Sequence, residues 1–540
     1  MKLNSLKQVN IMNLITSPWI PVRRRKSRST EYIRPDQLTE GHEDNPVVAV
    51  DFPRPDLSSG VVVFLVGLFQ LAMTPKNNRR WHKNYEQPPA PQELEAVLKP
   101  WRDYFQVDGD GARCFQDLEL ANETSRPISA LLIDEPGGQT LRHNVDLFIK
   151  RNQFPSLGLS ATVAALITMQ SSAPAGGQGH RTSLRGGGPL NTLLVPDPRN
   201  DELASTLWRI IWLNVLNRAE LESLSGNPAL EEPEFILPWL APTRTSERNT
   251  GTDTYPDHAH PLQMYFAMPR RIRLELDDLP GGPCPLTLRE EPLVEHYQTR
   301  NYGINYQGAW QHPLSPYRFD KEGLPIPLHP QPGGIGYRHW LHLALGSPES
   351  ARTRVEPAAV VQAGQNMWKD KRHVLIWSFG FDMDNMKARG WYESTMPVFH
   401  IAPERIDALA TRTEALIYAA EQISSNLRLA VRKAWFSEGA TVKGDLSAIT
   451  QSFWNNTESG FFDQLAQEHA ALEQRSDPPD RQEWLKQLNA ASLRLFDRFA
   501  ASGNIAFEDP KRIALARRDL IRFNARKSIK DRLRISSRAA

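Results

Sequence analysis

Cysteine is scarce in this chain, and the two cysteines present, Cys114 and Cys284, lie far apart in the sequence. Two distant cysteines make neither a disulfide framework nor a thiolate metal cluster. The sequence therefore excludes a secreted disulfide scaffold and a cysteine-ligated zinc protein, and a reducing cytoplasm is the expected compartment.

Long apolar runs are missing as well. The most apolar segment, residues 61–73, is shorter than the ~20 residues that a helix needs to cross a bilayer. The first residues lack the apolar stretch and the small-residue cleavage site of a secretory signal. We expect a buried helix at this segment and no membrane partner.

A strong net charge is also absent. The 540 residues carry a formal charge of +2, with 40% hydrophobic and 23% charged residues. This is the composition of an ordinary globular protein, and the length favours two or three domains. Any contact with nucleic acid must then come from local basic patches, because the field of the whole chain is nearly neutral.

Proline and glycine become rare after residue 404, where only three prolines and four glycines remain. Both residues interrupt regular elements, so the preceding part should be loop-rich mixed structure and the remainder helical. Apolar spacing predicts four helices, over about 403–436, 445–474, 480–501 and from 510 onward. The predicted fold class is α+β: a large mixed α/β N-terminal domain, residues 1–402, followed by a C-terminal antiparallel four-helix bundle, residues 403–540.

Local patterns predict several elements of the N-terminal domain. Residues 19–22 and 32–33 are interpreted as a hairpin around a charged turn at 23–28. Alternation predicts a half-exposed strand at 272–276, and 374–379 is a second strand candidate. Helices are predicted at 60–73, 91–101 and 204–217.

Residues 174–192 contain the densest glycine cluster, PAGGQGHRTSLRGGGPLNT. Glycines let backbone amides approach another molecule closely. A phosphate-binding P-loop requires Gly-Lys-Ser/Thr, and Gly179-His180-Arg181 stands at that place, so nucleotide hydrolysis is disfavoured. Two interpretations stay open: a flexible surface loop, and an anion-binding loop that uses Arg181 and Arg185. A second exposed loop, at residues 131–144, is by default a connector.

Residues 380–392, GFDMDNMKARGWY, are interpreted as a loop. It is either a structural turn with solvated charges, which the residues alone favour, or a site that mixes insertion-capable and phosphate-reaching side chains. Asp382 and Asp384 suggest paired carboxylates, but no further metal ligands stand nearby in the sequence and the EF-hand spacing fails. HExxH, GxSxG and Cys–His signatures are missing throughout. The sequence thus favours a protein that is not an enzyme, with no cofactor and no metal.

Basic residues gather at two places. Arg270, Arg271 and Arg273 lie on a short predicted strand, which is either a solvated face or a phosphate-reaching one. Residues 510–540 hold eleven Lys or Arg against two acidic residues, a formal balance of +9, with one apolar stripe. The stripe is needed for bundle packing, so outward-facing basic residues fit a nucleic-acid backbone better than a membrane.

Four segments together resemble the CasA-type large subunit of type I-E CRISPR Cascade complexes. They occur in the family's order and span nearly the whole chain: MNLITSPWIPV (12–22), SLRGGGPLNTLL (183–194), GFDMDNMKARGWYESTMPVF (380–399) and FWNNTESGFF (453–462). The family-like sequence begins at Met12, so residues 1–11 are interpreted as an extension or a misassigned start. Some relatives have a zinc-binding cysteine cluster, which this chain lacks, and some have a glutamine where it has Asp384 and Asn385.

The resemblance implies a function in RNA-guided antiviral defence. The family recognises the protospacer-adjacent motif in double-stranded target DNA from the minor groove, promotes unwinding and R-loop formation, and helps recruit a helicase–nuclease. The implied partners are this DNA, the guide RNA, the other Cascade subunits and the helicase–nuclease.

The resemblance also implies which residues bind DNA. A glycine loop suits the narrow minor groove and falls at Gly176, Gly177, Gln178 and Gly179. A basic finger falls at Arg270 or Arg271, and a wedge that separates the first base pairs falls at Asp384, Asn385 and Met386. A loop that touches the guide RNA end of the complex and approaches the DNA falls at Ile133 and Asp134.

Two hypotheses of other classes remain. A metal-dependent nuclease or hydrolase would assemble its ligands from residues scattered in the sequence. A purely structural scaffold would make no DNA contact at all.

Overall fold

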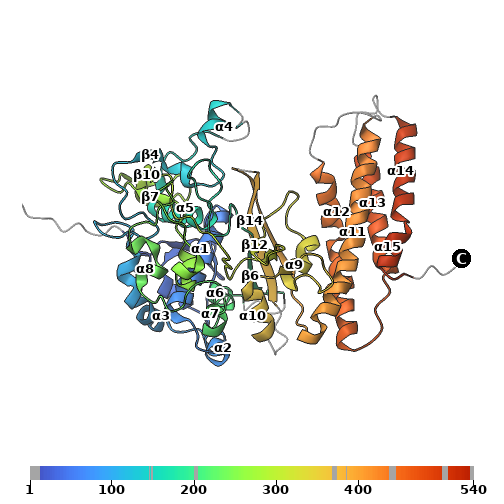
Figure 1. Ribbon diagram of the computed structural model, residues 1–540, viewed down its shortest axis with the longest axis horizontal. Coiled ribbons are helices and arrows are strands. Elements are labelled where there is room, and N and C mark those ends of the chain that lie inside the picture. The colour runs from blue at the N-terminus through green and yellow to red at the C-terminus, as the bar shows by residue number, and fades with distance from the viewer. Residues whose placement is uncertain are drawn as a thin grey trace, which may run out of the picture. The chain divides into compact units, whose positions relative to one another are not determined.

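The computed structural model describes residues 12–144, 146, 150–199, 205–367, 374–384, 386–436, 446–500 and 509–535. The chain divides into two compact units (Figure 1). The first unit comprises residues 1–330, 358–367 and 378–392, and the second comprises 331–357, 368–377 and 393–540.

The predicted N-terminal hairpin is present. Strand β1 (Ile20–Arg24) pairs antiparallel with β2 (Glu31–Ile33), and its other edge pairs with β3 (Val47–Val50). Trp19, just before β1, is fully buried, and its indole Nε1 donates a hydrogen bond of 2.9 Å to the Leu14 carbonyl. The hairpin is thus fixed to the interior at its first residue.

Helix α1 (Pro55–Met73) and helix α5 (Leu159–Ser172) pack against each other in the interior of the first unit. α1 is long and apolar enough to cross a membrane by composition, but 83% of its most apolar window is buried within the protein. The helix predicted at 60–73 is therefore confirmed as a core helix, and it begins earlier, at a proline that suits the first helical turn.

Two small antiparallel sheets cover part of this interior. In the first, the strands follow the order β4 (Thr124–Pro127), β10 (His296–Arg300), β7 (Arg271–Leu274), and in the second the order β5 (Leu157–Gly158), β9 (Glu290–Val294), β8 (Gly281–Pro283). The strand predicted at 272–276 is thus present as β7. The predicted half-exposed alternation is confirmed, because Ile272, Leu274 and Leu276 are buried and the charged residues between them are partly exposed. Arg271, just before this range, is buried and pairs with Asp117.

The segment 380–392 is not a loop, and that prediction is wrong. It belongs to a long hairpin of β14 (Val374–Asp384) and β15 (Lys387–Pro397), and β14 also pairs with β6 (Asn191–Pro196). Phe379 and Phe381 of β14 are buried and contact Trp391 of β15 at ring-centroid distances of 5.6 and 4.9 Å. These aromatic contacts across the hairpin hold two strands where glycine and charged residues had indicated a loop.

Shorter elements complete the first unit. The helices are α2 (Asn78–Glu86), α3 (Pro91–Leu98), α4 (Gly138–Arg142), α6 (Leu207–Leu213), α7 (Arg218–Glu222), α8 (Pro233–Ile236) and α10 (Ala359–Met367), and the strands are β11 (Tyr317–Phe319) and β12 (Pro325–Pro327). The helix predicted at 91–101 changes to a 3-10 helix at Lys99, directly before a proline. The helix predicted at 204–217 is shorter, as α6, and Ala204 lies outside the described residues.

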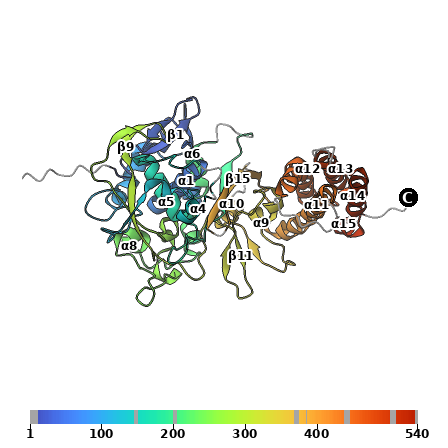
Figure 2. The same ribbon diagram turned by 90° about the horizontal axis from the view of Figure 1, so that it is seen from above.

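The second unit is mainly helical. It contains β13 (Val355–Glu356), α9 (Trp340–Ala344) and the C-terminal helices α11 (Ile406–Trp435), α12 (Ser447–Glu473), α13 (Gln482–Ala500), α14 (Pro510–Asn524) and α15 (Lys527–Arg532). The four long helices run alongside one another, seen from the side in Figure 1 and from above in Figure 2. α11 contacts α12, α13 and α14. The last predicted helix, at 510 onward, is broken near Ala525 into α14 and α15.

The predicted apolar stripes face the space between these packed helices. Leu409, Leu416, Ile423 and Leu427 of α11 are buried, as is Leu520 of α14. The mixed α and β class with a helical C-terminal region is confirmed. The antiparallel four-helix bundle fits the packing of α11 to α14, and the division into domains at 402/403 stays a prediction.

Candidate nucleic-acid interface

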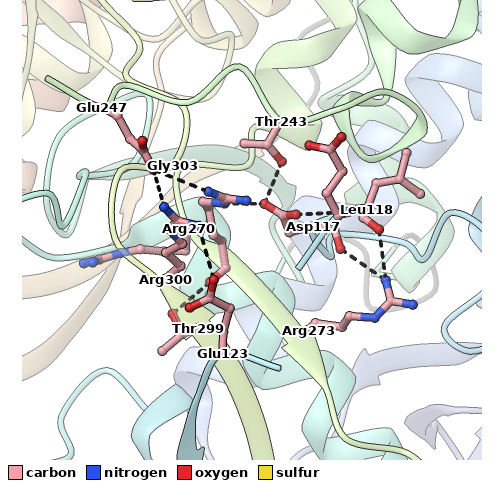
Figure 3. Close-up of polar contacts among 12 residues, drawn as sticks. Asp117, Leu118, Glu123, Thr243, Glu247, Arg270, Arg273, Thr299, Arg300 and Gly303 are labelled. Carbon is pink, nitrogen blue, oxygen red and sulfur yellow. Dashed lines mark hydrogen bonds and ion pairs between the residues drawn. The ribbon is translucent and has the colours of Figure 1, made fainter. Parts of the chain in front are cut away.

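Two neighbouring arginines at the start of β7 have different surroundings. Arg271 is 6% exposed, and its Nε donates to Asp117 at 2.6 Å. Asp117 is fully buried and also accepts from the Thr243 hydroxyl at 2.8 Å, and its backbone carbonyl accepts from Arg273 at 3.2 Å (Figure 3). Arg271 is therefore a buried ion-pair residue of the sheet.

Arg270 is partly buried and has no carboxylate partner among the described residues. Its Nη2 donates to the Pro174 carbonyl, at the start of the glycine cluster, while its buried Nε has no hydrogen-bond partner within the described ranges. Gln170 of α5 fixes its backbone from both sides, with bonds of 3.0 Å to the amide and 2.9 Å to the carbonyl. Burial lowers the pKa of Arg270 to about 10, so its guanidinium remains charged at neutral pH.

The glycine loop, residues 176–179, is a turn with its tip in solvent. Gly176, Gly177 and Gln178 are exposed, and Gly177 and Gly179 have φ angles of +94° and +76°, which glycine adopts without strain. The loop is tied down at one side, because Asn301 donates to the Gln178 carbonyl at 2.9 Å and the Tyr302 amide donates to the Gly179 carbonyl at 2.7 Å. This geometry leaves the loop's outer backbone accessible.

His180 connects the loop with the finger candidate. Its ring packs where a Cβ on Gly176 would lie, at 2.8 Å, and its buried Nδ1 has no hydrogen-bond partner. Burial, followed by the nearby charge of Arg270, lowers the pKa of His180. The ring is therefore neutral at neutral pH and adds no charge to the loop.

The glycine cluster also touches the β14–β15 hairpin. A Cβ on Gly187 would lie 3.3 Å from Pro174 and Ala175, and one on Gly188 would lie 2.6 Å from the Met383 side chain and 3.0 Å from the Phe381 carbonyl. Arg270 thus contacts the start of the glycine cluster, and Gly188 of the same cluster contacts β14. The structure brings these three sequence-predicted elements into one region of the first unit.

The hairpin tip presents the wedge candidates. Asp384 exposes 60% of its side chain and lies 3.7 Å from Arg389, while Met386 is 55% exposed. Asn385 lies outside the described residues. Below the tip, Arg389 makes a two-pronged ion pair at 2.7 and 3.2 Å with the buried Asp382.

This Asp382–Arg389 pair is a positioning contact that the sequence reasoning missed. It joins the two strands directly beneath the exposed tip and raises the pKa of Arg389 through its hydrogen bonds to Asp382. Asp382 had been considered only as a catalytic or metal carboxylate. Recognising the segment as a hairpin would have placed the two charges across from each other.

The arginines inside the glycine cluster do not present an anion-binding surface. Arg181 bonds to the Ser246 hydroxyl and carbonyl at 2.7 and 3.1 Å, and Arg185 is only 3% exposed. Arg185 donates to Asn191 at 2.6 Å and to Ser315 at 3.2 Å. The interpretation of Arg185 as part of an exposed anion-binding loop is therefore wrong, because its side chain turns into the protein.

The predicted guide-RNA loop begins in the interior. Ile133 is buried, whereas Asp134 exposes 49% of its side chain and accepts from Arg54 at 2.8 Å. Beyond them, α4 stands at the outer end of a protruding segment of the first unit (Figure 1). The segment is therefore anchored at residues 133–134 and is no plain exposed connector over 131–144.

Metal ligands do not gather in the part of the chain that the structure describes. No group of three or more His, Cys, Asp or Glu residues there could hold a metal ion. Both cysteines are buried and free, and burial raises the pKa of the Cys114 thiol well above its ordinary value.

Comparison with known proteins gives one consistent family. The family model described as CRISPR-associated protein Cse1 matches residues 13–495. CasA from Thermus thermophilus has a similar structure, with a TM-score of 0.67 and 16% identity over 95% of this chain and 99% of the other. Cse1 from Thermobifida fusca gives a TM-score of 0.66 and 15% identity over 97% and 98%. A chain of a CRISPR RNA-guided surveillance complex gives a TM-score of 0.64 and 17% identity over 94% and 99%.

Proposed function

The chain belongs to the Cse1 family of CRISPR-associated proteins, and from this membership we propose that it is the large subunit of a type I-E Cascade surveillance complex. In this role it reads the protospacer-adjacent motif of double-stranded DNA from the minor groove and promotes unwinding and R-loop formation. It acts in the cytoplasm beside guide RNA and the other Cascade subunits, and helps recruit the helicase–nuclease. A solved chain of similar fold comes from an RNA-guided surveillance complex.

The observation that carries the proposal is the contact chain from Arg270 through the glycine cluster, residues 174–192, to the β14–β15 hairpin. A duplex reader needs a slender element for the minor groove, a cation for its negative potential and a side chain that enters between base pairs. The exposed glycine tip, Arg270 and Met386 supply one each. Their grouping on one unit supports the assignment.

Of the two finger candidates, we assign the role to Arg270. Arg271 is held by buried Asp117, and withdrawing it would leave that carboxylate unpaired in the interior, a cost of several kcal/mol. Arg270 has no carboxylate partner among the described residues, and its guanidinium is held there by a hydrogen bond to the Pro174 carbonyl. A phosphate or a base edge can take the place of that contact.

The finger assignment is tested with the reconstituted complex and target duplex over a series of salt concentrations. Arg270→Ala should weaken binding at least tenfold and reduce the dependence of log K on log salt by about one unit, because one cation fewer displaces counterions. Arg23→Ala, an exposed arginine on β1, is the matched control and should leave both quantities unchanged. Wild-type affinity and salt dependence for Arg270→Ala would refute the assignment.

The wedge assignment concerns Asp384, Asn385 and Met386. Inserting a side chain between base pairs costs a few kcal/mol of unstacking, which contacts formed during strand separation must offset. Met386→Gly should therefore slow R-loop formation more than it weakens initial duplex binding. Leu324→Gly is the control, since Leu324 is another exposed apolar residue near a hairpin turn. Equal losses in both steps would count against a wedge.

The proposed role is one of binding and not of catalysis. The competing nuclease hypothesis is checked by incubating the purified chain with labelled duplex and Mg²⁺ or Mn²⁺. We expect intact duplex. Cleavage that disappears in the Asp382→Ala/Asp384→Ala variant would replace our proposal with a catalytic one.

A further inference from the structure

The first unit encloses a small cavity beside the glycine cluster. Its volume is about 10 Å³, room for one water-sized species. Apolar side chains of α1, α5 and the segment 264–267 form much of its wall. The polar side chains that line it are Gln170, Ser171, Arg185, Tyr265 and His312.

Arg185 brings a positive charge to this cavity without a matching negative one. It is 3% exposed, and its hydrogen bonds go to neutral groups: Asn191, Ser315 and the Ser171 carbonyl. Burial lowers the pKa of Arg185 to about 10, so the guanidinium stays protonated at neutral pH. Among the described residues no carboxylate forms an ion pair with it, and a buried charge without a counter-charge is costly.

The other polar groups of the wall add donors. The Tyr265 hydroxyl is buried and has no hydrogen-bond partner in the part of the chain that the structure describes. The His312 Nδ1 accepts a hydrogen bond from the Leu314 amide at 3.1 Å, so the proton of the neutral ring is on Nε2. Gln170 already bonds to Phe115 and to both backbone groups of Arg270. The wall therefore offers donors and a positive charge, its amide acceptor is already engaged, and the hydroxyl oxygens of Ser171 and Tyr265 are its remaining side-chain acceptors.

We propose that this cavity binds a single small monovalent anion, of the halide class, between Arg185 and Tyr265, whose side chains move slightly apart because a halide is larger than a water molecule. A water molecule in the same place could give its protons to the hydroxyl oxygens of Ser171 and Tyr265, but it would leave Arg185 without a counter-charge. An anion accepts from the Tyr265 hydroxyl and supplies that counter-charge. Chloride is the halide that cells contain in quantity.

The site has a structural role next to the glycine loop. Gln170 lies in its wall and also fixes the backbone of Arg270. Ser171 also lies in the wall, and its backbone carbonyl accepts a hydrogen bond from Arg185. The anion therefore stabilises the C-terminal part of α5, from which the glycine loop starts. This assignment concerns the chain itself and does not depend on the proposed function.

The direct test is crystallographic. Crystals of the full chain soaked in bromide and measured at the bromine absorption edge should give an anomalous peak in the cavity, within hydrogen-bond reach of Arg185 and Tyr265. Crystals of Tyr265→Phe should lose the peak or most of its height. A cavity that shows only a water, with no anomalous peak in the native protein, would overturn the proposal.

A solution test needs no crystals. Replacing gluconate, which is too large to enter, by chloride at equal ionic strength should raise the Tm of the native chain by about 2 °C, since a ligand of the folded state stabilises it. Tyr265→Phe should remove most of this chloride response. Tyr297→Phe, a buried tyrosine outside the cavity wall, should keep it. The same Tm in both salts for the native chain would contradict an anion site.

Discussion

The arginines of the first unit and those of helix α14 carry the same charge in opposite environments. Arg271 is buried and pairs with the buried carboxylate of Asp117, whereas Arg185 is buried among neutral groups. Arg518 and Arg522 expose 69% and 66% of their side chains and share Asp519 at 3.7 and 3.3 Å. The arginines of the sequence's most basic segment are therefore solvated, while the short basic strand places Arg271 in the interior.

The difference matters for energy as well as for position. A surface ion pair gains little in water and is weakened further by salt. A buried ion pair stabilises the fold little more than apolar residues of similar volume would, but removing one partner leaves an unpaired charge in the interior. Charged residues of the first unit should thus be sensitive to substitution in proportion to their burial, and those of α14 should not.

The largest effect is expected at Asp117. Asp117→Asn leaves the buried Arg271 with only Glu247, at 4.0 Å, as a counter-charge and should lower the free energy of unfolding by about 3 kcal/mol. Unfolding in denaturant, followed through the transition of the first unit, measures this loss of free energy. Adding Arg271→Met to the same variant should restore part of the loss, since both charges are then gone. No recovery in the double variant would mean that Asp117 acts through Thr243 and the backbone and not through the ion pair.

The sequence predicted much of this fold because several signals are local. A continuous apolar run identified α1, hydrophobic spacing identified α11 and α13, and the charged turn between β1 and β2 identified that hairpin. The β14–β15 hairpin was misjudged as a loop, because its strands are held by aromatic contacts with Trp391 and not by an alternating pattern. Cross-strand packing of this kind has no signature in a single segment.

The candidate site was predicted in its parts and not in its geometry. The resemblance located the glycine loop, the finger and the wedge by residue, but left Arg270 and Arg271 equivalent. Their difference depends on Asp117, more than 150 positions away. Burial created by such distant contacts cannot be inferred from the residues next to each arginine.

A smaller effect is expected within the glycine loop. Gly179→Ala places a Cβ 2.9 Å from the Asn301 Cβ at a φ of +76° and should cost about 2 kcal/mol of stability. Gly177→Ala has a comparable φ of +94° but open space around the new methyl, so only the backbone strain of about 1 kcal/mol remains. Thermal unfolding compares the two. A greater loss for Gly177→Ala would show that the loop's tip is not solvent-exposed.

His312 gives the first unit a dependence on pH. Burial, and then the charge of Arg185, holds the pKa of His312 well below 6.5. The unfolded chain takes up this proton near pH 6.5 and the folded chain does not, so stability falls as pH drops below about 6.5, by up to about 1.4 kcal/mol per pH unit. His312→Asn keeps an acceptor for the Leu314 amide and should make the fall less steep. An identical slope in native and variant chains would mean that the folded state protonates His312 normally.

The smallest effect is expected on α14, at Arg517. Its guanidinium pairs with Asp497 of α13 at 2.7 Å, as short as many buried pairs, but the two side chains remain 42% and 52% exposed. Because water solvates both groups whether or not they meet, Asp497→Asn should change the free energy of unfolding by at most about 1 kcal/mol, and less in high salt. Measuring it beside Asp117→Asn separates distance from burial, since the two ion pairs have nearly the same length. Similar losses for both substitutions would mean that pairing distance alone sets the energy, and burial would no longer explain why the first unit and α14 differ.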